Sequence, residues 1–376
     1  MTDNKRPVPG AGMRGIAGKL VLSEYFVLML SVVYFFIIAA IVPSMLRPNN
    51  LRNIFSNMWP LFTIAIGQTF VLLLGGIDLS QISVMALTSV IGAAFMSQGA
   101  NPDVLGKSPL WGWFLTEAGG PLAQMPDLWS TAIAIAIMLL VGTLIGFING
   151  SLIARLKMPP FMVTLISQMF FSALAIYITK SQNIIFLPIP FEDLGGTAVS
   201  FIPYSFFVAV ALAIVAQIIL SFTLRGRFIY ATGANIRAAT ISGVSTARTT
   251  VFVYSFSGFC AAVGSVLYSA RLMMGRPTLG ATMLMDIMAA TVIGGTSLAG
   301  GKGKVTWTLY GVLFYTILST SLQQLKLDNF TIDIVKGFII LLAATLDAVR
   351  QRMTRHGRGG TALGAPPVQE ETAHAN

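Results

Sequence analysis

Long apolar stretches recur along the whole chain, and they limit its fold more strongly than any other feature. A helix that crosses a membrane needs about 20 consecutive apolar residues to span roughly 30 Å of hydrocarbon. The segments that meet or approach this length are 25–42, 54–77, 79–97, 128–154, 158–179, 202–224, 249–270, 283–295, 305–325 and 332–349. The sequence therefore predicts an all-α, polytopic membrane protein with about ten transmembrane helices.

The composition agrees with this fold class. Hydrophobic residues make up 55% of the chain and charged residues 10%, whereas a soluble domain carries roughly 25% charged residues. The net charge of +10 raises the question of a nucleic-acid partner. The basic residues, however, cluster beside apolar runs and are not interleaved with aromatic residues, so we expect no nucleic-acid partner and membrane lipid as the surroundings.

The charge distribution predicts an orientation. Basic residues and no cleavable signal mark residues 1–21 as a cytoplasmic tail under the positive-inside rule. Ten crossings then give a membrane domain over 22–350 and a cytoplasmic tail over 351–376, whose Gly, Pro and Ala content predicts disorder. The basic residues of the predicted inner loops are Arg155, Lys157, Arg225, Arg227, Arg237, Arg248, Lys302 and Lys304.

The predicted outer loops, 98–127 and 180–203, are mainly acidic. Four arginines fall on the outer side and so depart from the positive-inside pattern: Arg47, Arg52, Arg271 and Arg276. We expect them to be paired or to snorkel.

Two glycine pairs interrupt the apolar runs. The first lies in LLLGGIDLSQISVMAL at 72–87 and the second in TVIGGTSLAGGKGK at 291–304. Glycines and a carboxylate at membrane depth are tolerated mainly where the backbone is buried in protein or faces a water-filled cavity. We expect broken or re-entrant segments here, which would lower the number of crossings to eight. The candidate gate or pathway residues are Gly75, Gly76, Asp78, Ser80, Gly294, Gly295 and Thr296.

Asp78 has two interpretations that the sequence leaves equal. It can be a pathway residue, or it can cap the next helix by accepting hydrogen bonds from N–H groups near Ser80 or Gln81. Four intramembrane amides are candidates for a substrate path, or for hydrogen bonds between helices: Gln68, Asn149, Gln168 and Gln217.

Another three glycines, Gly142, Gly146 and Gly150, have the four-residue spacing of close helix packing.

No catalytic or energy-coupling chemistry is visible. The glycines before Lys302 do not form a phosphate-binding loop, because Thr296 and Gly303 break the pattern. Both histidines, His356 and His374, lie in the tail, and the single cysteine, Cys260, lies inside an apolar run where it is expected to pack. We therefore predict no enzyme activity, no cofactor and no metal site. Transport energy must come from a partner or an ion gradient.

Four motifs in one order resemble those of the ribose/xylose/arabinose-type ABC sugar permeases, of the branched-chain amino acid/sugar permease superfamily. They are GGIDLS at 75–80, KMPPFMVTL at 157–165, ATGANIRAATISGV at 231–244 and IMAATVIGGTSLAGGKGKV at 287–305. The resemblance implies a sugar-import permease of the bacterial inner membrane. It also implies a second permease chain, cytoplasmic ABC ATPase subunits and a periplasmic sugar-binding protein. Departures at Gln81, Ile82 and Ile236, and an insertion over 98–127, leave the particular sugar undefined.

The third motif has a structural interpretation of its own. Asn235 can cap a short inner helix over 236–242 that ends at Gly243, and this helix is either a connector or a docking element. In the family the loop contacts the ATPase, which assigns coupling to Asn235, Arg237, Ala238, Ala239 and Gly243.

An ion-coupled secondary transporter remains the alternative function. Broken helices with an acidic residue near the bilayer midplane are expected of that class too. Its coupling ion would require Asp78, Asp286 or Asp333 to be buried and titratable.

Overall fold

The computed structural model describes residues 25–199, 202–328, 330–339, 341–342 and 345. The predicted tails, 1–21 and 351–376, lie outside these residues. Strands in the described part are limited to a hairpin of β1 (Thr197–Val199) and β2 (Ile202–Pro203), in which Thr197 pairs with Pro203. The all-α fold class is confirmed.

Six helices are long and apolar enough to cross a membrane: α3 (Pro48–Leu73), α6 (Asp127–Arg155), α7 (Pro160–Thr179), α9 (Tyr204–Phe222), α12 (Thr246–Leu272) and α14 (Val305–Gln324). Three shorter apolar helices are α2 (Phe26–Ile41), α4 (Gln81–Met96) and α13 (Leu284–Gly294). The connecting helices are η1 (Pro43–Leu46), α5 (Pro102–Leu105), α8 (Ile189–Asp193), α10 (Leu224–Ala234) and α11 (Ile236–Ile241). Each of the first nine predicted segments thus contains a helix.

Part of the last predicted segment, 332–349, is outside the described residues, but residues 330–339 are helical. Asp328 caps this helix, because its carboxylate accepts hydrogen bonds from the hydroxyl and backbone N–H of Thr331 at 2.6 and 3.0 Å. The Thr331 hydroxyl, followed by the backbone N–H, lowers the pKa of the exposed Asp328 carboxyl.

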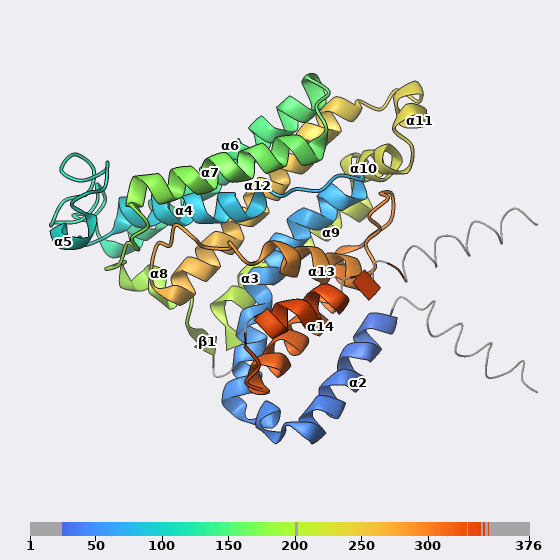
Figure 1. Cartoon of the computed structure of the whole chain (residues 1–376). Helices are drawn as coiled ribbons and strands as arrows, with labels where there is room; N and C mark the ends of the chain where they lie inside the picture. Colours follow the sequence, from blue (N-terminus) through green and yellow to red (C-terminus); the bar gives the residue numbers. More distant parts are fainter. Residues whose placement is uncertain (1–24, 200–201, 329, 340, 343–344, 346–376) are drawn as a thin grey trace, which may run out of the picture.

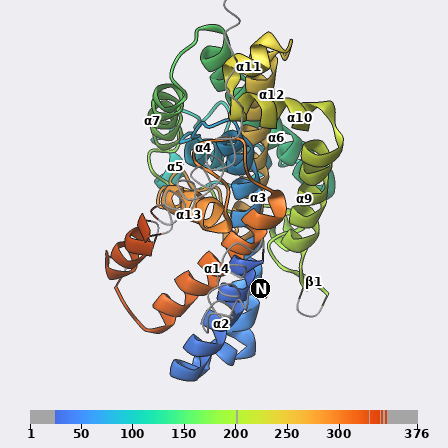
Figure 2. The ribbon, with the colours of Figure 1, turned by 90° about the vertical axis from the view of Figure 1, so that its right-hand side faces the viewer.

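Helix α12 is the centre of the bundle and packs against α3, α4 and α6 (Figure 1). Figure 2 shows α7 and α9 on opposite sides of α3 and α4. The closest packing is between α6 and α12, where a Cβ atom on Gly146 would lie 2.2 Å from the carbonyl oxygen of Tyr254. Gly142 and Gly150 approach α12 in the same way, so the predicted packing role of this glycine triplet is confirmed.

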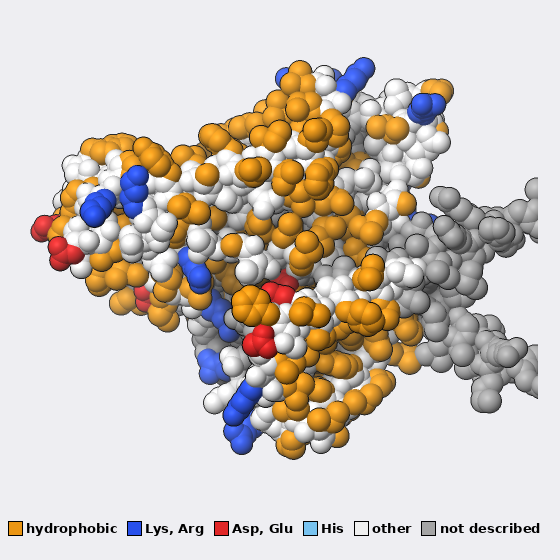
Figure 3. Space-filling view, in the orientation of Figure 1, with side chains coloured by type: hydrophobic (Ala, Val, Ile, Leu, Met, Phe, Trp, Pro, Cys, Tyr) orange, Lys and Arg blue, Asp and Glu red, His pale blue; other side chains and the backbone are white. Residues whose placement is uncertain are grey.

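Burial separates the core helices from the lipid-facing ones. Every residue of α3 from Met58 to Leu73 is buried, whereas α7 and α9 expose large apolar side chains such as Phe170 and Val215. Hydrophobic side chains cover most of the upper face over α6 and α7 in Figure 3. Such apolar surfaces on long helices suit contact with lipid. Cys260 is fully buried, which confirms its packing role.

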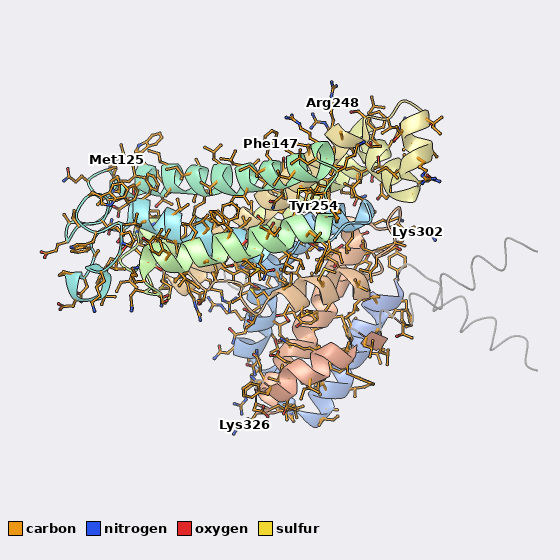
Figure 4. The ribbon with its side chains drawn as sticks, turned by 45° about the horizontal axis from the view of Figure 1, so that its top comes forward. Met125, Phe147, Arg248, Tyr254, Lys302 and Lys326 are labelled. Carbon is orange, nitrogen blue, oxygen red and sulfur yellow. The ribbon has the colours of Figure 1, made fainter. Side chains whose placement is uncertain are left out.

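Arg248 and Lys302, from two of the predicted inner loops, lie at the same end of the bundle in Figure 4, which we call the basic end. Arg155 and Arg248 line the same surface, and Arg225 lies 4.6 Å above the ring of Phe252 near the start of α12. Segment 98–127 forms a folded cap at the other end of α4 and α6. Its Leu115 is fully buried, and its ends are joined by a 2.6 Å hydrogen bond from Gln98 to Asp127.

Candidate functional site

The first glycine break separates α3 from α4 and carries a buried hydrogen-bond network. Asp78 is 1% exposed. Its Oδ1 accepts hydrogen bonds from the backbone N–H and the hydroxyl of Ser80 at 2.9 and 2.6 Å, and its Oδ2 accepts one from the hydroxyl of Ser257 on α12 at 2.7 Å. The predicted hydrogen bond from the Ser80 N–H is therefore present, but the N-cap residue of α4 is Ser80 itself, so Asp78 lies before the cap.

The network extends from Asp78 to three more helices. Asn149 of α6 donates to the Ser80 hydroxyl at 2.9 Å. Gln81, the first residue of α4, donates to Ser257 at 2.9 Å and to the carbonyl oxygen of Ile64 in α3 at 3.3 Å. The network of Asp78, Ser80, Gln81, Asn149 and Ser257 thus connects α3, α4, α6 and α12 at the break.

Tyr254 lies against this break and was not singled out from the sequence. Its buried hydroxyl has no hydrogen-bond partner in the described structure. A Cβ atom on Gly76 would lie 2.5 Å from that hydroxyl oxygen. Gly76 therefore provides the space that Tyr254 fills, and Figure 4 shows Tyr254 in the interior of the bundle.

The four candidate pathway amides do not meet at one place. Asn149 belongs to the Asp78 network, whereas Gln68 of α3 faces α13, with its Nε2 3.1 Å from the sulfur of Met288. Gln217 donates to Ser221 within α9 at 2.7 Å. Gln168 lies half-buried on α7. Of these four amides, the structure thus brings only Asn149 close to the first glycine break.

The second glycine break lies between α13 and α14. A Cβ atom on Gly294 would lie 2.3 Å from the carbonyl oxygen of Trp307, and Gly295 ends α13 with a φ of +109°. Thr296 is buried, and its hydroxyl has no partner among the described residues. These glycines let α13 turn sharply and pack on α14.

The two breaks contact each other and also contact α10. The backbone N–H of Gly301 donates to the carbonyl oxygen of Leu73 at 2.9 Å. A Cβ atom on Gly233 of α10 would lie 1.7 Å from that same oxygen, and one on Gly300 would lie 3.0 Å from the backbone nitrogen of Gly75. Tyr230 of α10 also donates to the carbonyl oxygen of Gly303 at 2.7 Å. Backbone from three distant parts of the sequence therefore meets here.

Helix α11 follows directly and has the predicted cap. The Asn235 side chain accepts a hydrogen bond from the N–H of Ala238 at 3.0 Å, and Gly243 follows the helix with a φ of +83°. Arg237 and Ala238 are exposed, whereas Ala239 is 5% exposed. Figure 2 shows α11 at one end of the molecule. Its Ile241 is 87% exposed.

Asp286 on α13 and Asp333 on the helix over 330–339 are the other two carboxylates that a coupling ion would require. Asp286 forms an ion pair with Lys336 at 3.3 Å and accepts a hydrogen bond from the hydroxyl of Tyr315 on α14. Asp333 is exposed. Within the described residues, His, Cys, Asp and Glu form no group of three that could hold a metal ion.

Comparison with known proteins shows which family this chain belongs to. The family of permease components of branched-chain amino acid transport systems matches residues 50–344, which include both glycine breaks and α11. The chain belongs to this permease family. Its members are permease subunits and not enzymes, so the predicted lack of enzyme activity agrees with the family.

Among curated proteins, the chain is similar to ribose import permease proteins RbsC. It is 32% identical over 320 residues to that of Haemophilus influenzae, covering 83% of this chain and 88% of the relative. It is 33% identical over 313 residues to that of Bacillus subtilis, with the same coverage. The L-arabinose ABC transporter permease protein AraH of Azospirillum brasilense is 27% identical over 329 residues, 88% of each chain. No solved structure matches the chain.

Proposed function

We propose that this chain is the membrane-spanning permease subunit of an ATP-binding-cassette importer for a small sugar. The single observation that carries the proposal is the family match across residues 50–344, supported by relatives named for ribose and L-arabinose import. An ABC ATPase supplies the energy, and a periplasmic sugar-binding protein delivers the substrate. The same match favours this function over an ion-coupled secondary transporter.

The proposed location is the bacterial inner membrane, with residues 22–350 as the membrane domain and both termini in the cytoplasm. The position of Arg248 and Lys302 at the basic end supports this orientation under the positive-inside rule. Arg47 and Arg52, at the start of α3, lie at the opposite end of that helix from the basic end. A second permease chain completes the pathway, either as a homodimer or as a related heterodimer.

The two glycine breaks form the proposed gate, comprising Gly75, Gly76, Asp78, Ser80, Gly294, Gly295 and Thr296. The backbone contacts among Leu73, Gly301 and Gly233 support this role, because they connect α10 and α11 to both breaks. A displacement of α11 by the ATPase would therefore reach the gate through α10. Asn235, Arg237, Ala238, Ala239 and Gly243 make up the proposed coupling element.

Reconstitution tests this function. The permease is placed in proteoliposomes with its ATPase and binding protein, and uptake of labelled D-ribose, L-arabinose and D-galactose is measured with ATP inside. We expect uptake of at least one sugar that requires ATP and both partners. Uptake by the permease alone under an imposed proton or sodium gradient would overturn the proposal in favour of a secondary transporter.

A further inference from the structure

Residues 273–283 connect α12 to α13 through an irregular segment that follows α4. At one end, Ile184 and Gly275 exchange backbone hydrogen bonds of 2.9 and 2.8 Å, and a Cβ atom on Gly275 would lie 2.3 Å from that of Ala93. At the other end, a Cβ atom on Gly280 would lie 3.1 Å from the sulfur of Met85. The segment therefore follows α4 for about two turns, or roughly 11 Å.

This irregular segment has an apolar side and a polar side. Pro277 and Leu279 are buried, whereas Arg276, Thr278 and Thr282 are exposed. The segment begins beside Ile184 of the predicted outer loop and follows α4, an apolar helix predicted to lie in the membrane, so we expect its later residues at membrane depth. Irregular backbone at that depth is tolerated only where it is buried in protein or borders water. Because this polar side is exposed, we expect it to border water.

The polar side continues onto α13. Asp286 lies in the first turn of α13, four residues after Thr282, and it is held by Lys336 and Tyr315. Charged residues of both signs lie on and beside this surface: the cations Arg276 and Lys336, and the carboxylates Asp286 and Asp333. Figure 3 shows charged side chains in the hollowed middle of this face, between apolar surfaces.

The lipid-facing helices present a different surface. Helix α9 exposes Phe207, Val215 and Phe222, and a charged side chain in such a position would be expensive in hydrocarbon. The surface of Arg276, Thr278, Thr282 and Asp286 is thus unsuited to lipid. It suits water and a hydrogen-bonding substrate.

We propose that Arg276, Thr278, Thr282 and Asp286 form a polar lane that is one wall of the substrate path. The lane takes an uncharged polyhydroxylated molecule, and this assignment rests on the proposed sugar import. Threonine hydroxyls donate and accept hydrogen bonds, a carboxylate accepts them, and guanidinium and ammonium groups donate them. The exposed Met285 beside Asp286 adds apolar surface for the C–H groups of a sugar.

Single-cysteine labelling tests the lane, because the only natural cysteine, Cys260, is fully buried. Thr278→Cys and Thr282→Cys are compared with Val215→Cys, which is 51% exposed on α9. Each permease variant is placed in lipid nanodiscs and treated with a charged, membrane-impermeant methanethiosulfonate reagent. Labelling after denaturation in detergent counts the total thiol in each sample, and the unmodified chain gives the Cys260 background.

We expect both lane cysteines to react at least about tenfold faster than Val215→Cys, because hydrocarbon excludes a charged reagent. Reaction of Thr278→Cys and Thr282→Cys no faster than that of Val215→Cys would overturn the proposal that the lane borders water. This labelling needs neither ATP nor the ATPase, so its failure is distinguishable from a failure of ATP-driven uptake, which would overturn the importer.

Uptake tests the ligand class separately. In the reconstituted importer, Thr282→Ser keeps a hydroxyl and Thr282→Val keeps the side-chain shape. We expect Thr282→Val to lower uptake of the transported sugar several-fold and Thr282→Ser to retain it, with equal ATPase recovery. Equal uptake by the two variants would show that the Thr282 hydroxyl does not contact the substrate, and would overturn this part of the proposal.

Discussion

Asp78 is a buried carboxylate whose hydrogen-bond donors are neutral groups. Ser80 and Ser257 provide the three hydrogen bonds, and no lysine or arginine pairs with Asp78 in the described part of the chain. Burying a charge is unfavourable unless hydrogen bonds or an opposite charge offset the loss of water. The geometry therefore favours a structural role that joins α4 to α12 across the break.

Replacement of Asp78 separates its charge from its hydrogen bonds. Asp78→Asn keeps an oxygen that can accept from Ser80, and we expect it to retain uptake. Asp78→Ala leaves the Ser80 and Ser257 donors unsatisfied, at about 1–3 kcal/mol for each buried group. Uptake is measured in proteoliposomes and stability by thermal unfolding in detergent. Loss of uptake by Asp78→Asn at normal stability and ATPase binding would show that the charge itself matters.

Gly233 provides a second residue-scale prediction. A methyl group there would lie 1.7 Å from the carbonyl oxygen of Leu73, a backbone atom that cannot move away alone. We expect Gly233→Ala to separate α10 from the end of α3, and to lower both uptake and the unfolding temperature. Gly337→Ala is the matched control, because nothing lies within 4 Å of its Cβ position. Equal behaviour of the two variants would contradict the close contact.

At the scale of elements, one side of α11 is held by a cap and by packing, and the other side is exposed. Asn235 caps the helix and Ala239 is buried, whereas Ala238 is exposed. A substitution at Ala239 would therefore disturb the packing of the helix itself. Ala238 is the position at which a new side chain tests contact with a partner.

We expect Ala238→Glu to reduce ATP-driven uptake strongly while membrane insertion is unchanged, because the charge projects into the proposed ATPase contact. Ala238→Ser is the matched small substitution and should transport normally. Co-purification of the ATPase with each variant measures the contact directly. Unchanged recovery and unchanged uptake with Ala238→Glu would make α11 a simple connector.

The ends of the helices show how far apolar patterns predict this fold. The prediction for α14, 305–325, differs from the observed Val305–Gln324 by one residue. For α3 the predicted 54–77 is wrong at both ends, since the helix is Pro48–Leu73. Its polar first turns are helical after a proline at the first position. After the C-cap residue Leu74 the chain turns at Gly75, whose φ is +77°, so Ile77 lies outside the helix. Backbone conformation, not apolarity, ends this helix.

The candidate site was partly visible in the sequence. Asp78 and Ser80 stand out because they are polar residues beside paired glycines. Ser257 and Tyr254 resemble ordinary residues of an apolar helix, and they enter the site only when α12 packs on α4. The ion pair of Asp286 and Lys336 joins residues 50 positions apart, a separation that periodicity cannot reveal.

At the scale of the whole molecule, the two ends of the bundle differ in charge and in structure. The basic end contains α10, α11 and both glycine breaks, all joined through Leu73 and Gly301. The other end has the folded cap of residues 98–127, with Asp103 and Glu117. This arrangement places the contacts proposed for coupling far from the folded cap (Figure 1).

The orientation of the whole molecule in the membrane can be tested by the same labelling of single cysteines. Ile241→Cys reports on the basic end and Trp113→Cys on the cap, and the natural residues are 87% and 73% exposed. In spheroplasts we expect an impermeant thiol reagent to label Trp113→Cys and not Ile241→Cys, because the positive-inside rule puts the basic end in the cytoplasm. Inside-out vesicles should reverse the pattern. The opposite result in both preparations would invert the topology, and with it the assignment of α11 to an ATPase contact.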